Sequence, residues 1–271
     1  MTTCNICNKK EAVARSLCHT CYCRLRHQGK LDRITPFSPE LPLQFSNEQH
    51  DILIGSLLGD GCIFKYKPTH KPYFSILRKA ADEEYLLWEY NKFKNFCVAK
   101  PIYKSTYDSR TNKIYFSIKF ITCRSELFDS YYNNWYPNNT KIVPQNIEIS
   151  PLAMAIWFCD DGCITTNKSA PHRMHLKLAT HGFDQNSICM LHELLQNRYK
   201  EKFLINTDNS MSVPHMFISA GDNAARAFLN EIDSVFPESM IRKAYWRNPI
   251  ARFYNNKPVR TTVWSIRKNY Q

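Results

Sequence analysis

One pattern occurs twice in the chain, as Leu53-Ile-Gly-Ser-Leu-Leu-Gly-Asp60-Gly61 and as Met154-Ala-Ile-Trp-Phe-Cys-Asp-Asp161-Gly162. Each copy predicts an apolar helix that ends in an aspartate followed by glycine, the residue that most often follows a helix end. The negative end of the helix dipole disfavours a carboxylate at that place. A divalent cation would compensate, so Asp60 and Asp161 are candidate metal ligands.

The two copies belong to a duplicated region. Asp60 and Asp161 are 101 positions apart, and three further landmarks repeat at spacings of 97 to 102 positions: Asp82 with Asp184, Phe120 with Phe217, and Tyr136-Pro137 with Phe236-Pro237. The apolar periodicity between these landmarks predicts the order helix, strand, strand, helix, strand, strand, helix in each half. The predicted fold class is therefore α+β, with two pseudo-symmetric αββαββα halves.

The predicted halves occupy residues 41–150 and 151–271, and the second includes a basic C-terminal tail at 240–271. In the first half we expect helices at 47–59, 82–97 and 124–134, and strands at 61–67, 73–79, 102–107 and 114–120. In the second half we expect helices at 151–161, 184–200 and 222–235, and strands at 163–168, 174–180, 203–208 and 213–219. Ser46 or Asn47 would cap the first helix.

The composition points to a polyanionic partner. The 271 residues carry a formal net charge of +12, which suits nucleic acid or an anionic membrane surface. No run of about 18 apolar residues is present, so no membrane span is predicted. The polar N-terminus predicts no signal peptide. Eleven scattered cysteines favour reduced thiols in an intracellular protein over a secreted one. The Lys- and Asn-rich composition indicates an AT-rich genome, which predicts a bacterial or phage-infected cytoplasm or an organelle.

Residues 1–40 predict a small zinc-binding module. Two Cys-x-x-Cys pairs, Cys4 with Cys7 and Cys18 with Cys21, are separated by ten residues. Paired motifs of this kind supply four thiolates for tetrahedral Zn²⁺, whose binding would provide the folding energy of so short a segment. The module is also basic, which favours an extra contact with nucleic acid through these residues: Arg15, Arg24, Arg26, Lys30 and Arg33.

The two acid-ended helices could pack side by side through small residues such as Gly55 and Ala155. Asp60 and Asp161 would then meet, and two adjacent carboxylates need a cation between them. Mg²⁺ or Mn²⁺ is expected, because such ions complete their coordination with substrate phosphates and support attack of water on a phosphodiester. Gly59 and Asp160 are further candidate Mg²⁺ ligands, although only Asp161 aligns with Asp60, which favours a structural role for Asp160.

The predicted strands and turns carry basic side chains that could contact DNA phosphates. Neutralised phosphates release counterions, so binding would weaken steeply with salt, by a slope of about −0.9 per contact. The candidates are Lys65, Lys67, Lys71, Lys104, Arg110, Lys113, Lys119, Lys168, Arg173 and Lys177.

The two acid-ended patterns resemble the paired motifs of the LAGLIDADG homing endonucleases, in the single-chain branch with two motifs. The segments Lys141-Ile-Val-Pro144 and Met240-Ile-Arg-Lys243 are similar to that branch as well. The resemblance covers about residues 47–248. It implies a monomer whose halves form a saddle over double-stranded DNA, with a long asymmetric target site. It also implies metal-dependent cleavage of both strands, leaving short 3′ overhangs.

The resemblance also assigns residues. It makes Asp60 and Asp161 the metal ligands, and it places a basic residue near each active site, Lys141 and Lys243, where it would polarise water or stabilise charge at the phosphate. Ile156 departs from the family consensus, which has glycine there. The cysteine module lies outside the nuclease fold and is similar to accessory clamps of phage-like homing enzymes.

Three functions fit these features. The first is a site-specific double-strand DNA endonuclease. The second is a maturase that binds its intron RNA and assists splicing, and the third is a non-catalytic DNA-binding regulator on the same fold. Two intact aspartates favour cleavage, and the lack of an obvious helix-turn-helix segment disfavours the regulator.

Overall fold

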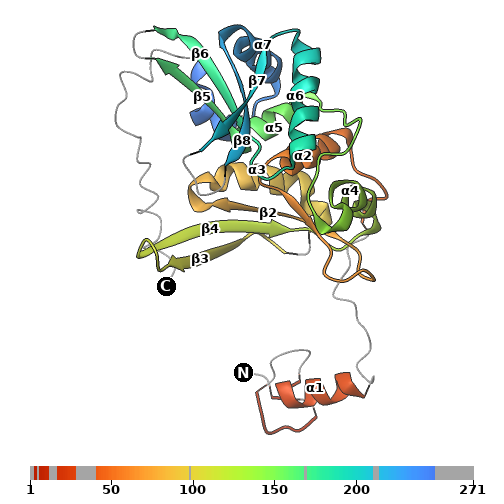
Figure 1. Ribbon diagram of the computed structural model, residues 1–271. Helices are drawn as coiled ribbons and strands as arrows, with labels where there is room; N and C mark the ends of the chain where they lie inside the picture. The colour runs from red at the N-terminus through yellow and green to blue at the C-terminus, as the bar shows by residue number, and fades with distance from the viewer. Residues whose placement is uncertain are drawn as a thin grey trace. The chain divides into compact units, whose positions relative to one another are not determined.

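The computed structural model describes residues 3–4, 6–11, 17–28, 41–97, 99–167, 170–209 and 214–247. The chain divides into two compact units, Met1–Leu41 and Pro42–Gln271. The smaller unit contains helix α1 (His19–His27), and all other helices and strands belong to the larger unit (Figure 1). No helix in the described part of the chain is long and apolar enough to cross a lipid bilayer. The predicted Lys168 contact falls outside the described residues.

The larger unit contains two halves with the same order of elements. The first half has helices α2 (Asn47–Leu58), α3 (Glu83–Phe93) and α4 (Asp129–Trp135), and strands β1 (Cys62–Phe64), β2 (Tyr73–Lys79), β3 (Ile102–Asp108) and β4 (Lys113–Ile121). The second half has helices α5 (Pro151–Asp161), α6 (Gln185–Tyr199) and α7 (Asp222–Ile232), and strands β5 (Gly162–Asn167), β6 (Ala170–Ala179), β7 (Phe203–Asp208) and β8 (His215–Ala220). The predicted α+β class and αββαββα order are confirmed.

Each half forms one antiparallel four-stranded sheet, in the strand orders β1-β2-β4-β3 and β5-β6-β8-β7. β1 is shorter than the predicted strand at 61–67, because Pro68 and Pro72 in the following loop have no N–H group with which to continue a ladder. The predicted helix at 124–134 begins as a short 3₁₀ turn, and its α-helical part starts at Asp129.

Local capping explains where the two central helices begin. Ser46 caps α2: its hydroxyl accepts from the N–H of Gln49, and the Gln49 side chain accepts from the N–H of Ser46. This reciprocal pair satisfies two backbone donors that the helix itself leaves free. Ser150 caps α5 in the same way through the N–H of Ala153, and Pro151 occupies the first helical position.

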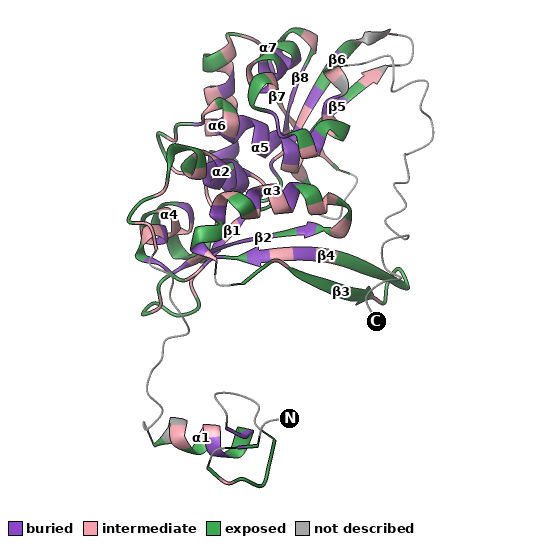
Figure 2. Ribbon diagram, turned by 180° about the vertical axis from the view of Figure 1, so that it is seen from behind, coloured by how far each residue is buried: buried purple, intermediate pink, exposed green. Residues whose placement is uncertain are grey.

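Helices α2 and α5 pack against each other at the centre of the larger unit, where Figure 2 shows both as buried. Gly55 makes this contact possible. A Cβ atom at Gly55 would lie 2.6 Å from the Ala153 carbonyl oxygen and 2.6 Å from Cβ of Ile156. Ile156 occupies the position at which the LAGLIDADG consensus has glycine. Gly55 on the facing helix leaves the space that the isoleucine side chain needs.

Each sheet has one face against helices and one open face. In β2, Phe74, Ile76 and Arg78 point to the helices and are buried, whereas Leu77 and Lys79 on the other face are exposed. α3 covers the inner face of β2 and β4, and α6 and α7 contact the second sheet. In β6 Met174, Leu176 and Leu178 are buried and alternate with Lys177, so Lys177 lies on the open face.

The strand registers correct one landmark of the duplication. Cys62 pairs with Ser75, and Cys163 pairs with Lys177, so β2 and β6 are related by 102 positions. Ser75 pairs with Ile121 and Lys177 with Ser219, which relates β4 to β8 by 98 positions rather than 97. A shift of one residue exchanges the two faces of a strand. Phe120 thus corresponds to the buried Ile218, and Phe217 lies on the open face.

Candidate active site

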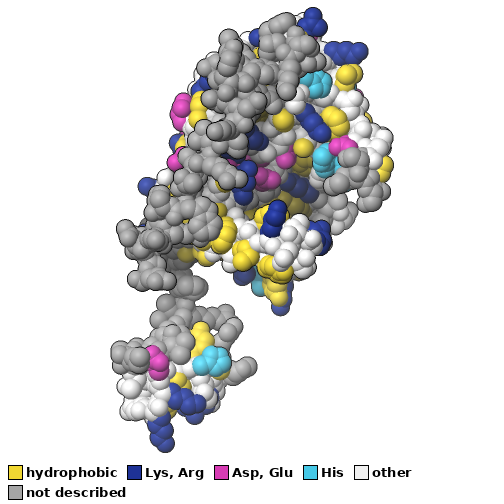
Figure 3. Space-filling model, turned by 90° about the vertical axis from the view of Figure 1, so that its left-hand side faces the viewer, with side chains coloured by type: hydrophobic (Ala, Val, Ile, Leu, Met, Phe, Trp, Pro, Cys, Tyr) yellow, Lys and Arg dark blue, Asp and Glu magenta, His cyan; other side chains and the backbone are white. Residues whose placement is uncertain are grey.

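The ends of α2 and α5 bring the two motif aspartates to one place. Asp60 follows the last turn of α2, and Asp161 is the last residue of α5. The N–H of Asp60 donates to Oδ2 of Asp160 at 3.0 Å, so one hydrogen bond joins the two helix ends. Burial raises the pKa of Asp161 to about 7, and the charges of Asp60 and Asp160 contribute to the shift. Figure 3 shows acidic side chains at the centre of one face of the larger unit, among Lys and Arg side chains.

Two lysines cap the carbonyl ends of these helices. Lys141 Nζ donates to the carbonyl oxygens of Gly59 and Gly61 at 3.2 and 3.1 Å. Lys243 Nζ donates to the corresponding oxygens of Asp160 and Gly162 at 3.2 and 3.1 Å. Each cation therefore lies at the negative end of a helix dipole. Burial lowers the pKa of both lysines, and the charges of the aspartates oppose that change.

Lys243 makes one further strong contact, with the Cys159 carbonyl at 2.6 Å. An ammonium group has three N–H donors, so three carbonyl oxygens within 3.2 Å use all of them. Among the described residues Lys141 donates to two, and it also lies 5.4 Å from the ring centre of Phe183. In the part of the chain that the structure describes, one N–H of Lys141 therefore has no carbonyl acceptor. The Gly59 carbonyl, a predicted Mg²⁺ ligand, accepts from Lys141.

Asp160 is enclosed within the protein. Its side chain has no exposed surface, and its carboxylate contacts Arg78 Nη2 at 2.8 Å and accepts from the Tyr85 hydroxyl at 3.3 Å and from the Asp60 N–H. Both oxygens are therefore engaged inside the chain, in agreement with a structural role. Asp60 differs, because 51% of its side chain is exposed.

Arg78 connects this cluster, and sequence reasoning missed it. Its guanidinium donates twice to Glu89 at 2.7 Å and once to Asp60 Oδ2 at 3.3 Å. The guanidinium also lies 4.1 Å from the ring centre of Tyr85. Burial raises the pKa of Glu89 to about 7 against the opposing charge of Arg78. The sequence does contain a sign of this cluster: the apolar periodicity places Arg78 and Glu89, both charged, on the sides of β2 and α3 that face the core.

The predicted DNA contacts divide into two groups. Lys104 and Lys119 lie on the open face of the first sheet, Arg173 and Lys177 share the open face of the second, Lys113 is exposed, and Arg110 is exposed in the β3–β4 turn. Lys67 lies 5.9 Å from the Tyr66 ring centre. Four of the candidates contact carboxylates: Lys65 lies 3.1 Å from Asp129, Lys71 2.8 Å from Glu126, Arg110 3.3 Å from Asp108 and Lys177 4.0 Å from Asp208. Lys79 also lies on the first open face and was not predicted.

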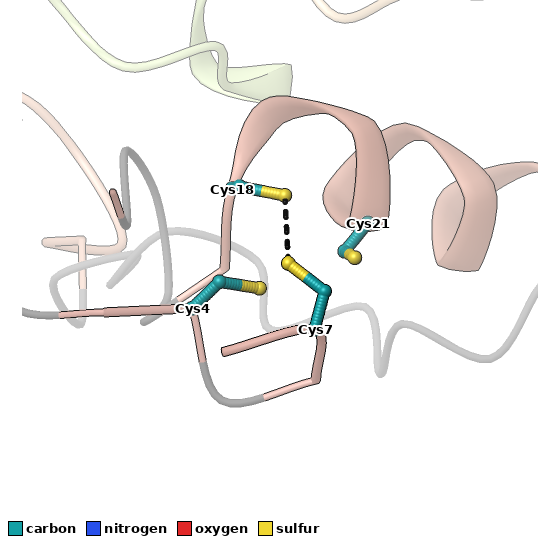
Figure 4. Close-up of side chains that lie close together, drawn as sticks. All are labelled: Cys4, Cys7, Cys18 and Cys21. Atoms are coloured by element: carbon teal, nitrogen blue, oxygen red, sulfur yellow. Dashed lines mark hydrogen bonds between the residues drawn. The ribbon is translucent and has the colours of Figure 1, made fainter. Parts of the chain in front are cut away.

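The four cysteines of the smaller unit lie close together (Figure 4). One sulfur from each of Cys4, Cys7, Cys18 and Cys21 lies within 4.8 Å of the others, and the Cys7 and Cys18 sulfurs are 3.8 Å apart. Zinc–sulfur bonds of about 2.3 Å in a tetrahedron place sulfurs roughly 3.8 Å apart, so this donor set fits Zn²⁺. Cys23 lies beside His19, outside this group.

The raised pKa of Asp161 predicts that stability falls as the pH rises. The carboxyl titrates near 3.8 when unfolded and near 7 in the fold, so between these values the folded protein binds more protons. Each rise in pH across this range therefore favours unfolding, by at most roughly 4 kcal/mol in total. Asp161→Asn is expected to be more stable than the unsubstituted protein near pH 8 without added Mg²⁺, with a smaller difference near pH 4.

Urea unfolding at both pH values measures this difference. Asp51→Asn, the same substitution in the N-terminal half of α2, is the control for the chemical change itself. A constant difference between Asp161→Asn and the unsubstituted protein would show that Asp161 stays ionised across the range.

Two packed helices with acidic ends, joined to two antiparallel sheets with open basic faces, define the class of LAGLIDADG proteins. Residues 50–228 match the LAGLIDADG DNA endonuclease family, and the chain belongs to that family. The fold is similar to that of the homing endonuclease I-WcaI bound to its DNA recognition sequence. The TM-score is 0.67 at 20% identity, covering 74% of this chain and 87% of that one.

Curated relatives include proteins of two kinds. The chain is 31% identical over 175 residues to the cytochrome b mRNA maturase bI2 of Debaryomyces hansenii, covering 63% of this chain and 64% of the relative. It is 26% identical over 172 residues to the DNA endonuclease I-ChuI of Chlamydomonas applanata, covering 58% of this chain and 75% of the relative. The chain thus spans slightly less than two thirds of that maturase's length.

Proposed function

We propose that this protein is a monomeric homing endonuclease that cuts both strands of double-stranded DNA at a long asymmetric site. The observation that carries the proposal is the meeting of the α2 and α5 ends, where Asp60 donates to Asp160 and its charge acts on Asp161. Membership of the LAGLIDADG DNA endonuclease family supports it. Reduced thiols and a nucleic-acid substrate fit an intracellular site of action.

Asp60 and Asp161 are the proposed ligands of Mg²⁺ or Mn²⁺. Such an ion supplies Lewis-acid activation of the scissile phosphate and of the attacking water when it is bound. The exposed carboxylate of Asp60 is open to an ion that also contacts substrate, whereas the enclosed Asp160 serves inside the protein. Lys141 and Lys243 hold the helix ends in place, and the remaining N–H of Lys141 is directed to water or a phosphate oxygen in this proposal.

The open sheet faces are the proposed DNA-binding surface. Lys104 and Lys119 on one sheet, and Arg173 and Lys177 on the other, are positioned to neutralise phosphates. Each contact contributes a slope of about −0.9 to the dependence of log affinity on log salt. Lys65 and Lys71 are expected to contribute least, because their ammonium groups pair with carboxylates at 3.1 and 2.8 Å, compared with 4.0 Å between Lys177 and Asp208.

Intron RNA is a second candidate partner, favoured by the 31% identity to a cytochrome b mRNA maturase. The two functions are separated by one pair of assays. The protein is incubated with intron-less and intron-containing copies of its host locus, with Mg²⁺ and then with EDTA, and separately with the precursor RNA. Cleavage of the intron-less DNA alone, abolished by EDTA, is the expected result. Splicing assistance without any DNA cleavage under Mg²⁺ or Mn²⁺ would select the maturase.

Zn²⁺ is the proposed cofactor of the smaller unit. Cys18→Ser is expected to lose the bound zinc and to make this unit sensitive to protease, because structural zinc contributes roughly 10–16 kcal/mol to such modules. Cys23→Ser is the matched control, since its sulfur lies outside the cysteine group. Metal analysis and limited proteolysis measure both effects, and full zinc retention by Cys18→Ser would contradict the ligand set.

The smaller unit is proposed to contact DNA as an accessory clamp. Its basic side chains include Arg24 on α1, beside the cysteine group. Deleting residues 1–40 should shorten the protected DNA footprint and weaken binding. Unchanged affinity and footprint length would remove this part of the proposal.

A further inference from the structure

We infer that Asp160 is a positioning residue for Asp60, and that it makes the two active-site aspartates unequal. Asp160 belongs to the second half of the larger unit and Asp60 to the first, so this contact joins the halves at the reaction centre. The inference deepens the proposed nuclease function and rests on it for its catalytic consequence. The structural part, the restraint on Asp60, can be tested separately.

Asp60 is held at two points. Its backbone N–H donates to Asp160 Oδ2 at 3.0 Å, and its carboxylate accepts from Arg78 Nη1 at 3.3 Å. Arg78 also contacts Asp160 Oδ1, at 2.8 Å from Nη2, so the three residues form a closed ring of contacts. The ring fixes both the main chain and the side chain of Asp60, while 51% of the side chain stays exposed.

The ring itself is anchored in the core. Arg78 and Asp160 have 4% and 0% exposed side chains, and Glu89, also 0% exposed, accepts two hydrogen bonds from the same guanidinium. Tyr85 donates to Asp160 and packs on Arg78. Packed and fully hydrogen-bonded side chains have little freedom to rotate. They therefore transmit a fixed position to the ligand that they touch.

Different residues occupy the equivalent positions around Asp161 in the second half. The spacings of 101 and 102 positions relate Asp160 to Gly59, Arg78 to Thr180 and Glu89 to Leu191. Thr180 donates to the Met216 carbonyl at 3.0 Å, and Leu191 is fully buried. Within the described ranges, the second site therefore has no guanidinium at the place of Arg78 and no carboxylate at the place of Asp160.

Gly59 is shaped for the same contact. A Cβ atom at Gly59 would lie 2.4 Å from Cβ of Asp160 and 2.5 Å from its Oδ2. Only glycine leaves room for the Asp160 side chain to reach the N–H of Asp60. The two residues that break the symmetry of the motif, Gly59 on one helix and Asp160 on the other, thus fit each other.

Asp160→Asn tests the consequence for catalysis. An amide has one oxygen, so it cannot accept from both Arg78 and the Asp60 N–H, and its NH₂ group must face one of these donors. Removing such a supporting contact lowers activity by about 10- to 100-fold. We expect this loss in the cleavage of one DNA strand relative to the other, measured with differently labelled strands in single-turnover reactions with Mg²⁺.

The strand ratio separates positioning from folding. Both strands are measured in one reaction, so a smaller folded fraction lowers both rates equally and leaves their ratio unchanged. Thr180→Val, at the position related to Arg78, is the matched control and should preserve the ratio. An unchanged ratio in Asp160→Asn, with or without a common loss of rate, would overturn the catalytic part of the inference.

Hydrogen exchange of the Asp60 amide tests the restraint without any cleavage assay. Because an amide side chain can keep one of the two bonds, this measurement uses Asp160→Ala. Exchange at Asp60 should accelerate relative to Leu57, whose amide lies inside α2. Equal acceleration at both amides, or none, would overturn the inference. The two proposals can fail separately. If the protein cuts no DNA, but hydrogen exchange in Asp160→Ala accelerates at the Asp60 amide alone, then the nuclease proposal fails and the positioning contact stands.

Discussion

Asp60→Asn and Asp161→Asn are each expected to abolish DNA cleavage while leaving DNA binding intact. The amide keeps the size of the side chain but loses the charge that holds a dication beside the scissile phosphate. Metal activation contributes several kcal/mol to the transition state, and a loss of roughly 4 kcal/mol corresponds to about a 10³-fold lower rate. Binding depends on the sheet faces, which neither substitution touches.

Gel-shift titration and single-turnover cleavage measure the two properties on the same DNA. Asp51→Asn is the control, because Asp51 lies in the first turns of α2, at the end remote from Asp60. It should bind and cleave normally. Cleavage of both strands at a normal rate by Asp60→Asn or Asp161→Asn would refute the assignment of these residues as metal ligands.

Arg78→Met is expected to destabilise the larger unit by about 3–5 kcal/mol. The substitution would leave Glu89 and Asp160 as buried carboxylates without their cation, and removing one partner of a buried ion pair has costs of this size. For a unit of this length the midpoint of thermal unfolding should fall by roughly 10 °C. The loss should be smaller near pH 5 than near pH 8, because protonation neutralises the stranded carboxylates.

Lys71→Met provides the comparison. Lys71 also pairs with a carboxylate, but 55% of its side chain and 74% of the Glu126 side chain are exposed. Such a surface pair contributes less than about 1 kcal/mol. Similar destabilisation by both substitutions would show that burial does not set the strength of the Arg78 cluster.

The order of elements could be predicted because it depends on local signals. Capping residues such as Ser46, apolar periodicity and the two acid-glycine ends act within a few positions of the chain. The strand register could not, because matching letters at Phe120 and Phe217 favoured an alignment that exchanges the faces of a strand. Only the pairing of Lys177 with Ser219 shows that Ile218 takes the buried place.

Local signals also account for the part of the candidate site that could be predicted. Asp60 and Asp161 are marked by the repeated motif, whereas Lys141 and Lys243 were expected only from the resemblance to the LAGLIDADG family. In the structure the two lysines lie at the ends of the motif helices. Arg78, Glu89 and Asp160 come from a strand, a helix and the opposite half. Their contacts arise only when three separate elements pack, and no spacing in the sequence specifies that coincidence.

The fit of Gly55 against Ile156 also limits how the two halves can be exchanged. A first half facing a copy of itself would set two glycines opposite each other and leave a void, whereas two second halves would bring isoleucine against isoleucine. Each half is therefore specific for the other, so separately produced halves should assemble only as an unlike pair. A larger side chain at position 55 would therefore need a smaller one on the facing helix, at Ile156.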